Sequence, residues 1–353
     1  MKTLEMLSMK PEVIPAMTAW YISDLSEARG RQELFTRQSP QRLKVLRDHA
    51  IIESAISSNR LEGVEIDKKR INDVILKNSR VKDRSEEEVR GYRDSLRLIH
   101  THYKKLRVDE TLIKKLHKIN RGEIWDAGSY KEKNVDIIEK KADGSRQIRF
   151  MTVKPGETPA YMRKLTGMWQ RSIEEKWVHP LIALAAFNLD FLCIHPFRDG
   201  NGRVSRLLLL LQFYQCGYAA GRFVSLENII EQNKDRYYET LKQSSQGWHR
   251  GKHDPWIYIN YLLFILKTAY KEFEESLGRI KSPRGAKTQQ VKRAVKNFSA
   301  EFTLSELERS CPGVSRDMIR IVLKEMKKER KIKCLGRGPG AKWAKKGNTL
   351  KRG

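Results

Sequence analysis

The chain has 353 residues, of which 70 are Lys or Arg and 43 are Asp or Glu, so its formal net charge is +27. With 39% hydrophobic and 32% charged residues, it is typical of a globular protein in water, long enough for two or three domains. Polar residues interrupt every apolar run before it reaches membrane-spanning length, and residues 1–5 begin no signal peptide. Together these features exclude a membrane protein and predict a cytoplasmic one without membrane partners.

The first 66 residues are expected to form an N-terminal region that ends in a single helix. Residues 1–38 contain two prolines and then a polar run, and they are predicted to be irregular. A helix is predicted over 39–63, because serine followed by proline favours a helix start and glycine favours a helix end. Ser58 and Glu62 are four residues apart in this helix and share one face, from which Glu62 could reach an arginine elsewhere in the chain.

Residues 67–280 are expected to form a core of α-helices with one β-hairpin. Apolar residues recur at helical spacing between residues 68 and 119, although this segment is highly charged. Residues 128–153 differ, because two runs rich in β-branched residues flank Asp143-Gly144-Ser145, which is a typical hairpin turn. Helical spacing returns after the hairpin, and one of the helices predicted there covers residues 228–243.

The nine residues from His195 to Arg203 separate two apolar stretches with helical spacing, at 181–194 and 204–214. A proline stops the first helix, and two glycines allow the chain to turn sharply before the second. The free backbone N–H groups at 200–203 therefore lie at the positive end of a helix. Phosphates and other anions bind at such helix ends.

The side chains around this loop suit chemistry on a phosphate ester. Arg203 and Arg206 lie three residues apart on one face of a helical turn and can bind phosphate oxygens. Asp199 would repel a phosphate unless a divalent cation lay between them, so Asp199 is a predicted Mg²⁺ ligand. His195 is placed where an imidazole can take a proton from an attacking hydroxyl. We therefore expect a reaction at a phosphate group of a nucleotide.

The segment from His195 to Arg206 also resembles a known motif. It matches every fixed position of the Fic family pattern H-x-F-x-[DE]-G-N-G-R-x-x-R. The resemblance implies a mainly α-helical fold that transfers AMP from ATP to a protein hydroxyl with Mg²⁺, with His195 as general base and Asp199 as the metal ligand. Asn201 would hold the α-phosphate, and Tyr238 would line the adenine side. The full ATP site implied in this way comprises Gly200, Asn201, Gly202, Arg203, Val204, Ser205, Arg206 and Tyr238.

Two further segments acquire a role from the same resemblance. Residues 58–63 match [ST]-x-x-x-E-[GN], which is the inhibitory motif of one class of Fic proteins. By this resemblance Glu62, with Ser58 beside it, would pair with Arg206 and displace the γ-phosphate from a productive position. The flap at 128–153 would hold a protein substrate by strand addition. Removal of AMP, with Glu62 positioning a water molecule, and a bifunctional enzyme both remain open.

Residues 281–353 are expected to form a separate, strongly basic domain. From residue 285 onwards the chain has 19 Lys and Arg but only 6 Asp and Glu. Helices followed by a basic hairpin resemble a winged helix, in which Arg316, Arg320 and Lys324 would be available to phosphates or base edges of DNA. DNA and a protein are alternative partners of this domain. A DNA-binding regulator that uses its core as a nucleotide sensor is the non-enzymatic alternative, and a homodimer is also left open.

Overall fold

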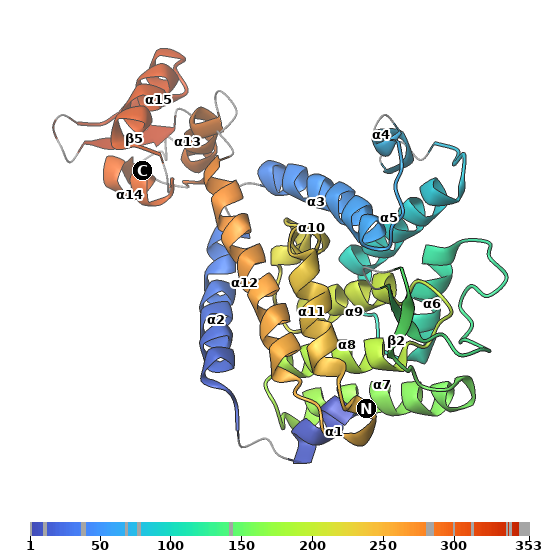
Figure 1. Ribbon diagram of the computed structural model, residues 1–353. Helices are drawn as coiled ribbons and strands as arrows, with labels where there is room; N and C mark the ends of the chain where they lie inside the picture. Colours follow the sequence, from blue (N-terminus) through green and yellow to red (C-terminus); the bar gives the residue numbers. More distant parts are fainter. Residues whose placement is uncertain are drawn as a thin grey trace. The chain divides into compact units, whose positions relative to one another are not determined.

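The structure is a computed structural model that describes residues 2–9, 13–36, 40–67, 70–75, 79–140, 144–279, 286–298, 301–311, 314–336, 338 and 341–345. The chain divides into two compact units, Met1–Leu277 and Gly278–Gly353 (Figure 1). Helices make up most of both units, which confirms the mainly α-helical prediction. Among the described residues, every helix is too short or too polar to cross a membrane.

The N-terminal region contains three helices: α1 (Lys2–Met9), α2 (Ala16–Thr36) and α3 (Pro40–Leu61). The prediction of an irregular stretch over 1–38 is therefore wrong. Leu4 and Leu7 of α1 are buried, and Asp190 accepts hydrogen bonds from the first N–H groups of that helix. A distant carboxylate thus caps the first turn of this short helix. The predicted helix at 39–63 agrees with α3, although Ser39 lies outside the described residues.

Two buried helices form the centre of the first unit: α8 (Pro180–Ile194) and α9 (Asn201–Gln215). Every residue from 181 to 194 is buried, as expected for a helix that is apolar all round. Surrounding helices include α5 (Arg84–His102), α6 (Glu110–Arg121), α7 (Thr158–Glu175) and α12 (Trp256–Arg279) (Figure 1). The loop 195–200 thus joins two helices whose positions are held by the core.

The predicted hairpin is present as strands β1 (Ile137–Lys140) and β2 (Arg146–Phe150), which pair antiparallel with Ile138 opposite Ile148. The helix predicted over 228–243 is divided at Asn233 into α10 (Leu226–Gln232) and α11 (Lys234–Ser245). The remaining elements of this unit are short, namely α4 (Ile71–Ile75), η1 (Pro155–Glu157), η2 (Ala220–Arg222) and η3 (Trp248–Arg250).

The second unit contains three helices and a three-stranded sheet among its described residues. Its elements in chain order are α13 (Ala286–Asn297), β3 (Phe302–Thr303), α14 (Leu304–Arg309), α15 (Arg316–Lys328), β4 (Ile332–Cys334) and β5 (Lys342–Lys345). The sheet is antiparallel in the order β3-β5-β4. One face of α15 is buried in a small core of its own.

Candidate active site

The loop between α8 and α9 is held closed by its own residues. Gly200 has a φ of 78°, which a residue with a Cβ rarely adopts. The side-chain oxygen of Asn201 accepts the Phe197 N–H at 2.9 Å, and its NH₂ group donates to the Phe197 carbonyl at 2.8 Å. The structure therefore assigns the Asn201 amide to closing the loop. The NH₂ group has a second N–H, so the role at the α-phosphate that the motif implies for Asn201 stays a prediction.

His195 directly follows α8 and has the tautomer that a general base needs. Its Nδ1 lies 3.4 Å from the Leu192 carbonyl, which can only accept a hydrogen bond, so Nδ1 carries the proton. The Nε2 lone pair is then free to accept another proton. Burial and the charge of Lys131 lower the pKa of His195 to about 4. The imidazole is therefore neutral at pH 7.

The first turn of α9 is where the sequence predicts an anion site. Val204 donates its N–H to the Gly200 carbonyl, and the Gly200 N–H donates to the Asp199 side chain at 2.5 Å. Among the described residues, the free donors are therefore the N–H groups of residues 201–203. The Val204 side chain is buried in the core, and the Ser205 hydroxyl donates to the Gly202 carbonyl at 2.8 Å. The Val204 side chain and the Ser205 hydroxyl are thus engaged within the protein. They would support phosphate binding only by stabilising the first turn of α9.

Glu62 and Arg206 form an ion pair across 144 residues of sequence. Arg206 donates to Glu62 Oε1 at 2.7 Å, and it also donates to the hydroxyl and the carbonyl of Ser58, both at 2.9 Å. Burial lowers the pKa of the Arg206 guanidinium, but Glu62 together with Tyr237 and Tyr92 outweighs burial and raises that pKa above its usual value. A Cβ placed on Gly202 would overlap the Glu62 carboxylate. Glu62 therefore lies against the first turn of α9, where a phosphate would bind.

Tyr238 is also engaged by the N-terminal region. Its hydroxyl donates to the Leu61 carbonyl at 3.0 Å, at the last residue of α3. Burial raises the pKa of Tyr238 to about 12, so the phenol keeps its proton and its role as a donor. Its ring packs edge-on against Tyr237, with the ring centres 5.0 Å apart. In this structure the side chain assigned to the adenine site holds the end of α3.

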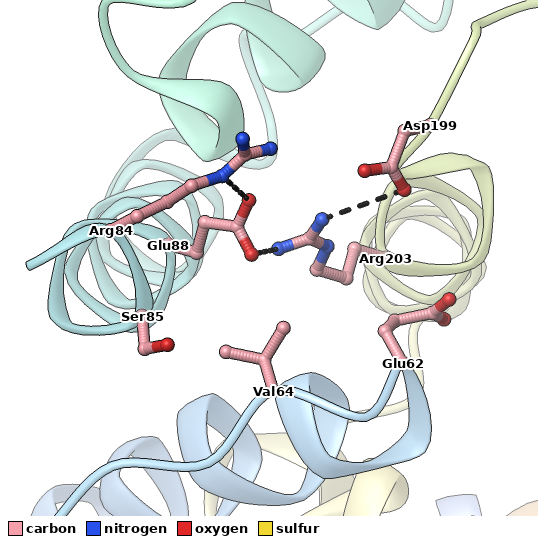
Figure 2. A pocket seen from close by; sticks show the side chains of 7 residues that line it. All are labelled: Glu62, Val64, Arg84, Ser85, Glu88, Asp199 and Arg203. Carbon is pink, nitrogen blue, oxygen red and sulfur yellow. Dashed lines mark hydrogen bonds and ion pairs between the residues drawn. The ribbon is translucent and has the colours of Figure 1, made fainter.

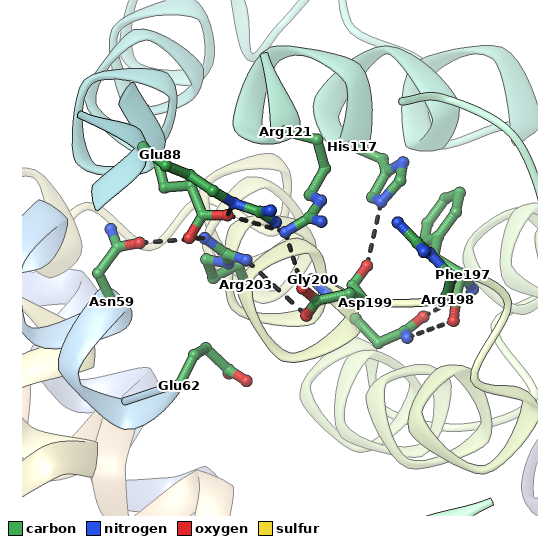
Figure 3. Close-up of polar contacts among 12 residues, drawn as sticks. Asn59, Glu62, Glu88, His117, Arg121, Phe197, Arg198, Asp199, Gly200 and Arg203 are labelled. Carbon is green, nitrogen blue, oxygen red and sulfur yellow. Dashed lines mark hydrogen bonds and ion pairs between the residues drawn. The ribbon is translucent and has the colours of Figure 1, made fainter. Parts of the chain in front are cut away.

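Polar and charged side chains from α3, α5, α6 and the loop before α9 surround the buried Arg203 (Figure 3). Arg203 donates to Glu88 at 2.8 Å and to Asn59 at 3.1 Å. Arg121 donates to Glu88 and to Asp199, both at 2.8 Å. The Arg203 Nε is buried and has no hydrogen-bond acceptor among the described residues, so it can still donate to a phosphate.

Asp199 is the candidate metal ligand and remains accessible, with half of its side chain exposed. Burial raises its pKa, but Arg121 and Arg203 outweigh burial and lower that pKa below its usual value. In the described part of the chain, no three metal-binding side chains cluster. A Mg²⁺ ion would therefore be bound by Asp199 together with phosphate oxygens, a combination that suits this metal.

A pocket of about 220 Å³ lies beside Asp199 and Arg203 (Figure 2). The loop after α3, the start of α5 and the start of α9 contribute its walls. The lining residues are Glu62, Val64, Arg84, Ser85, Glu88, Asp199 and Arg203. It brings the predicted inhibitory, metal-binding and phosphate-binding side chains to one place.

Sequence reasoning missed three residues of this site: Glu88, His117 and Arg121. His117 stacks on the Phe197 ring at 3.8 Å, accepts the Gly128 N–H and lies 3.1 Å from the Asp199 carbonyl. It thereby fixes the position of the loop. No local pattern distinguishes these three side chains from other charged residues of α5 and α6, because their roles depend on contacts between helices.

Part of the chain, including the loop between α8 and α9, is similar in sequence to known proteins. Residues 107–213 match the model of the Fic/DOC family. Over 93 residues the chain is 31% identical to the protein adenylyltransferase Fic of Culex quinquefasciatus, a segment that covers 26% of this chain but only 17% of that relative.

Two solved structures share the fold. A Fic family protein from Desulfovibrio desulfuricans G20 aligns with a TM-score of 0.62 and 20% identity, covering 96% of this chain and 98% of that one. A Fic domain containing signalling protein from Bacteroides thetaiotaomicron VPI-5482 has the same score and identity and covers 74% of this chain and 99% of its own. The segment that matches the Fic/DOC family model contains the whole loop and Arg206. The comparisons therefore support a Fic-type domain over residues 107–213.

Proposed function

We propose that this protein is an adenylyltransferase that moves AMP from ATP to a Tyr, Ser or Thr hydroxyl of a protein, including itself. The observation that carries the proposal is a neutral His195 beside the free N–H groups that open α9. Those N–H groups would bind the ATP phosphates, and Arg206 would bind the terminal phosphate once Glu62 releases it. Mg²⁺ bound by Asp199 would supply positive charge to the phosphate oxygens.

In the proposed reaction, the hydroxyl oxygen of the target forms a bond to the α-phosphorus of ATP. The bond from that phosphorus to the oxygen bridging it to the β-phosphate breaks, and pyrophosphate leaves. His195 takes the hydroxyl proton at Nε2, because Nδ1 already carries a proton. The N–H groups that precede Val204 stabilise the negative charge that develops on the transferred phosphate.

The proposed binding place for the target protein is the flap at 128–153. Its strands β1 and β2 pair only with each other among the described strands, so each has an outer edge with free backbone groups. Ile138 and Ile148 lie opposite each other and are both 55% exposed. An extended target segment could therefore add as a third strand and cover these two side chains.

The proposed resting state is inhibited by Glu62. Its carboxylate engages Arg206 and lies against Gly202, so it competes with the terminal phosphate of ATP for both partners. Ser58, Asn59 and Leu61 support this position through hydrogen bonds to Arg206, Arg203 and Tyr238. Activation would require that the end of α3 leave these partners.

Removal of AMP from a modified protein is the second candidate reaction. The observation that favours it is again the position of Glu62, since a carboxylate beside the anion site can orient a water molecule for attack on a phosphate. The two candidates make opposite predictions for a variant without Glu62, because removal needs this carboxylate and transfer does not.

For the second unit we propose a winged-helix domain that binds DNA. Helix α15 buries Ile319, Val322, Leu323 and Met326 and exposes basic residues on its other side. Arg316 and Arg320 are paired with nearby carboxylates. In the described part of this unit, exposed basic side chains without a carboxylate partner could contact phosphates, and they include Lys324, Lys327, Lys328 and Lys333.

ATP labelled at the α- or the γ-phosphate tests these reactions together. Transfer of the α-label but not the γ-label to protein is expected, with more transfer for Glu62→Gly than for wild type. Transfer of the γ-label would show a kinase-type reaction instead. Loss of AMP from a pre-labelled protein in wild type, but not in Glu62→Gly, would identify removal as the reaction.

A further inference from the structure

A buried lysine, Lys131, lies at the start of the flap segment and has been given no role of its own above. It is 4% exposed, and its ammonium group donates to the Thr152 hydroxyl at 2.7 Å and to the Ile194 carbonyl at 3.1 Å. Its backbone N–H donates to the Pro196 carbonyl at 2.9 Å. Burial of an ammonium group without a bonded carboxylate is costly. A side chain of this kind that contacts the catalytic loop is therefore a candidate for a specific role.

The two main-chain carbonyls that Lys131 binds lie immediately before and after His195. His195 has a φ of 54° and a ψ of 60°, in the left-handed region that residues other than glycine rarely occupy. Such a conformation persists only where its surroundings determine it. Lys131 binds the carbonyl of the peptide group between Ile194 and His195, and also the carbonyl of the peptide group that follows Pro196. It therefore fixes the loop before and after His195, and with it the direction of the imidazole.

The same lysine also contacts the base of the flap. The Thr152 hydroxyl that accepts from Lys131 donates to the Val135 carbonyl at 3.1 Å, and the Thr152 N–H donates to Asp136 at 3.0 Å. Residues 135 and 136 precede β1, and residue 152 follows β2. Lys131 therefore links both ends of the flap to the loop that carries His195.

We propose that Lys131 is a positioning residue that fixes the direction of the His195 ring and couples it to the flap on which the target protein docks. The coupling rests on the proposed function, in which His195 is the general base and the flap binds the target. A target seated on the flap would hold residues 135 and 152 in place, and through Lys131 it would stabilise the geometry of the base.

The charge of Lys131 provides a second, independent readout. Burial and Lys131 lower the pKa of His195 to about 4, while Glu62 and Asp199 oppose this effect. Burial lowers the pKa of Lys131 itself to about 8, and Asp136 opposes it. Removing the lysine charge makes protonation of the imidazole easier, so the pKa of His195 should rise by about one unit.

The test compares full-length Lys131→Met with Lys131→Arg, Thr152→Val and the control Lys105→Met, at an exposed lysine outside the flap. The pKa of His195 is measured by NMR titration of the ring nitrogens without nucleotide, and kcat and KM are measured for AMP transfer to a protein target. Lys131→Met should raise the pKa of His195 and lower kcat at least tenfold, with little change in the KM for ATP. Lys131→Arg keeps the charge and should keep the pKa. Thr152→Val should keep the pKa but raise the KM for the target, and Lys105→Met should change neither quantity.

An unchanged His195 pKa together with an unchanged kcat in Lys131→Met would overturn the proposal. If Lys131→Met fails to fold by circular dichroism, Thr152→Val decides, since a wild-type KM for the target in that variant would overturn the proposed coupling. The titration requires no turnover. A shifted pKa in a protein that transfers no AMP would therefore refute the proposed function while leaving the lysine as the residue that orients His195.

Discussion

Replacing Glu62 with glycine removes the Glu62–Arg206 ion pair and so tests the proposed inhibition directly. The side chain of Arg206 is 3% exposed and that of Glu62 is 25% exposed, so their 2.7 Å ion pair is only partly screened by water. A hydrogen bond between charged groups contributes about 1.5–3 kcal/mol. We take about 2 kcal/mol as the part of this hydrogen-bond energy that opposes phosphate binding. Removing Glu62 should then raise the rate of AMP transfer about thirtyfold, since 1.4 kcal/mol corresponds to a factor of ten.

The assay is the rate of auto-modification with α-labelled ATP at saturating Mg²⁺ and ATP. Position 62 lies just after the last residue of α3, so glycine there does not interrupt the helix. Glu65→Gly is a matched control, because Glu65 is exposed, and it should leave the rate unchanged. Arg206→Ala should not reproduce the activation, because it removes the ligand of the γ-phosphate as well as the partner of Glu62. The double variant should resemble Arg206→Ala.

A rate for Glu62→Gly that equals or falls below the wild-type rate would refute the inhibitory role of Glu62. If the same variant also stopped removing AMP from a modified protein, Glu62 would be a catalytic group of that hydrolytic removal. Activation by Glu65→Gly to the same extent would show that the effect arises from a looser chain after α3 and not from the released arginine.

Three other predictions concern the base, its pH dependence and the second unit. His195→Ala should abolish AMP transfer and change ATP affinity by less than about twofold in calorimetry, since the phosphate ligands are separate groups. Because the pKa of His195 is lowered to about 4, the imidazole is neutral at higher pH, so the rate should stay level between about pH 6 and 8 and fall only as the pH approaches 4. A steep fall between about pH 7 and 6 would contradict this assignment. Deleting residues 285–353 should preserve auto-modification and remove most affinity for duplex DNA. In the full-length protein, that affinity should fall about a hundredfold between 50 and 200 mM salt if four lysines contact phosphates. Salt-insensitive or absent DNA binding would indicate a protein partner.

Local sequence determined the elements that depend on neighbouring residues. The loop from His195 to Arg203 was predictable because proline and glycine act on their own backbone, and because an apolar stretch such as 181–194 has to be buried. The shared face of Ser58 and Glu62 follows from the helical period alone. The family motif then implied the partner of Glu62, which helical spacing by itself could not identify.

Tertiary structure decided the features that depend on contacts between distant segments. Helix α1 was missed because Asp190, far along the chain, caps its first turn. Glu88 and Arg121 belong to charged helices, and only the packing of α5, α6 and α9 shows that they surround Arg203. The same holds for Lys131. Each of these groups is defined by burial and by partners that lie tens of residues or more away in the chain, and a local pattern records neither the partner nor the burial.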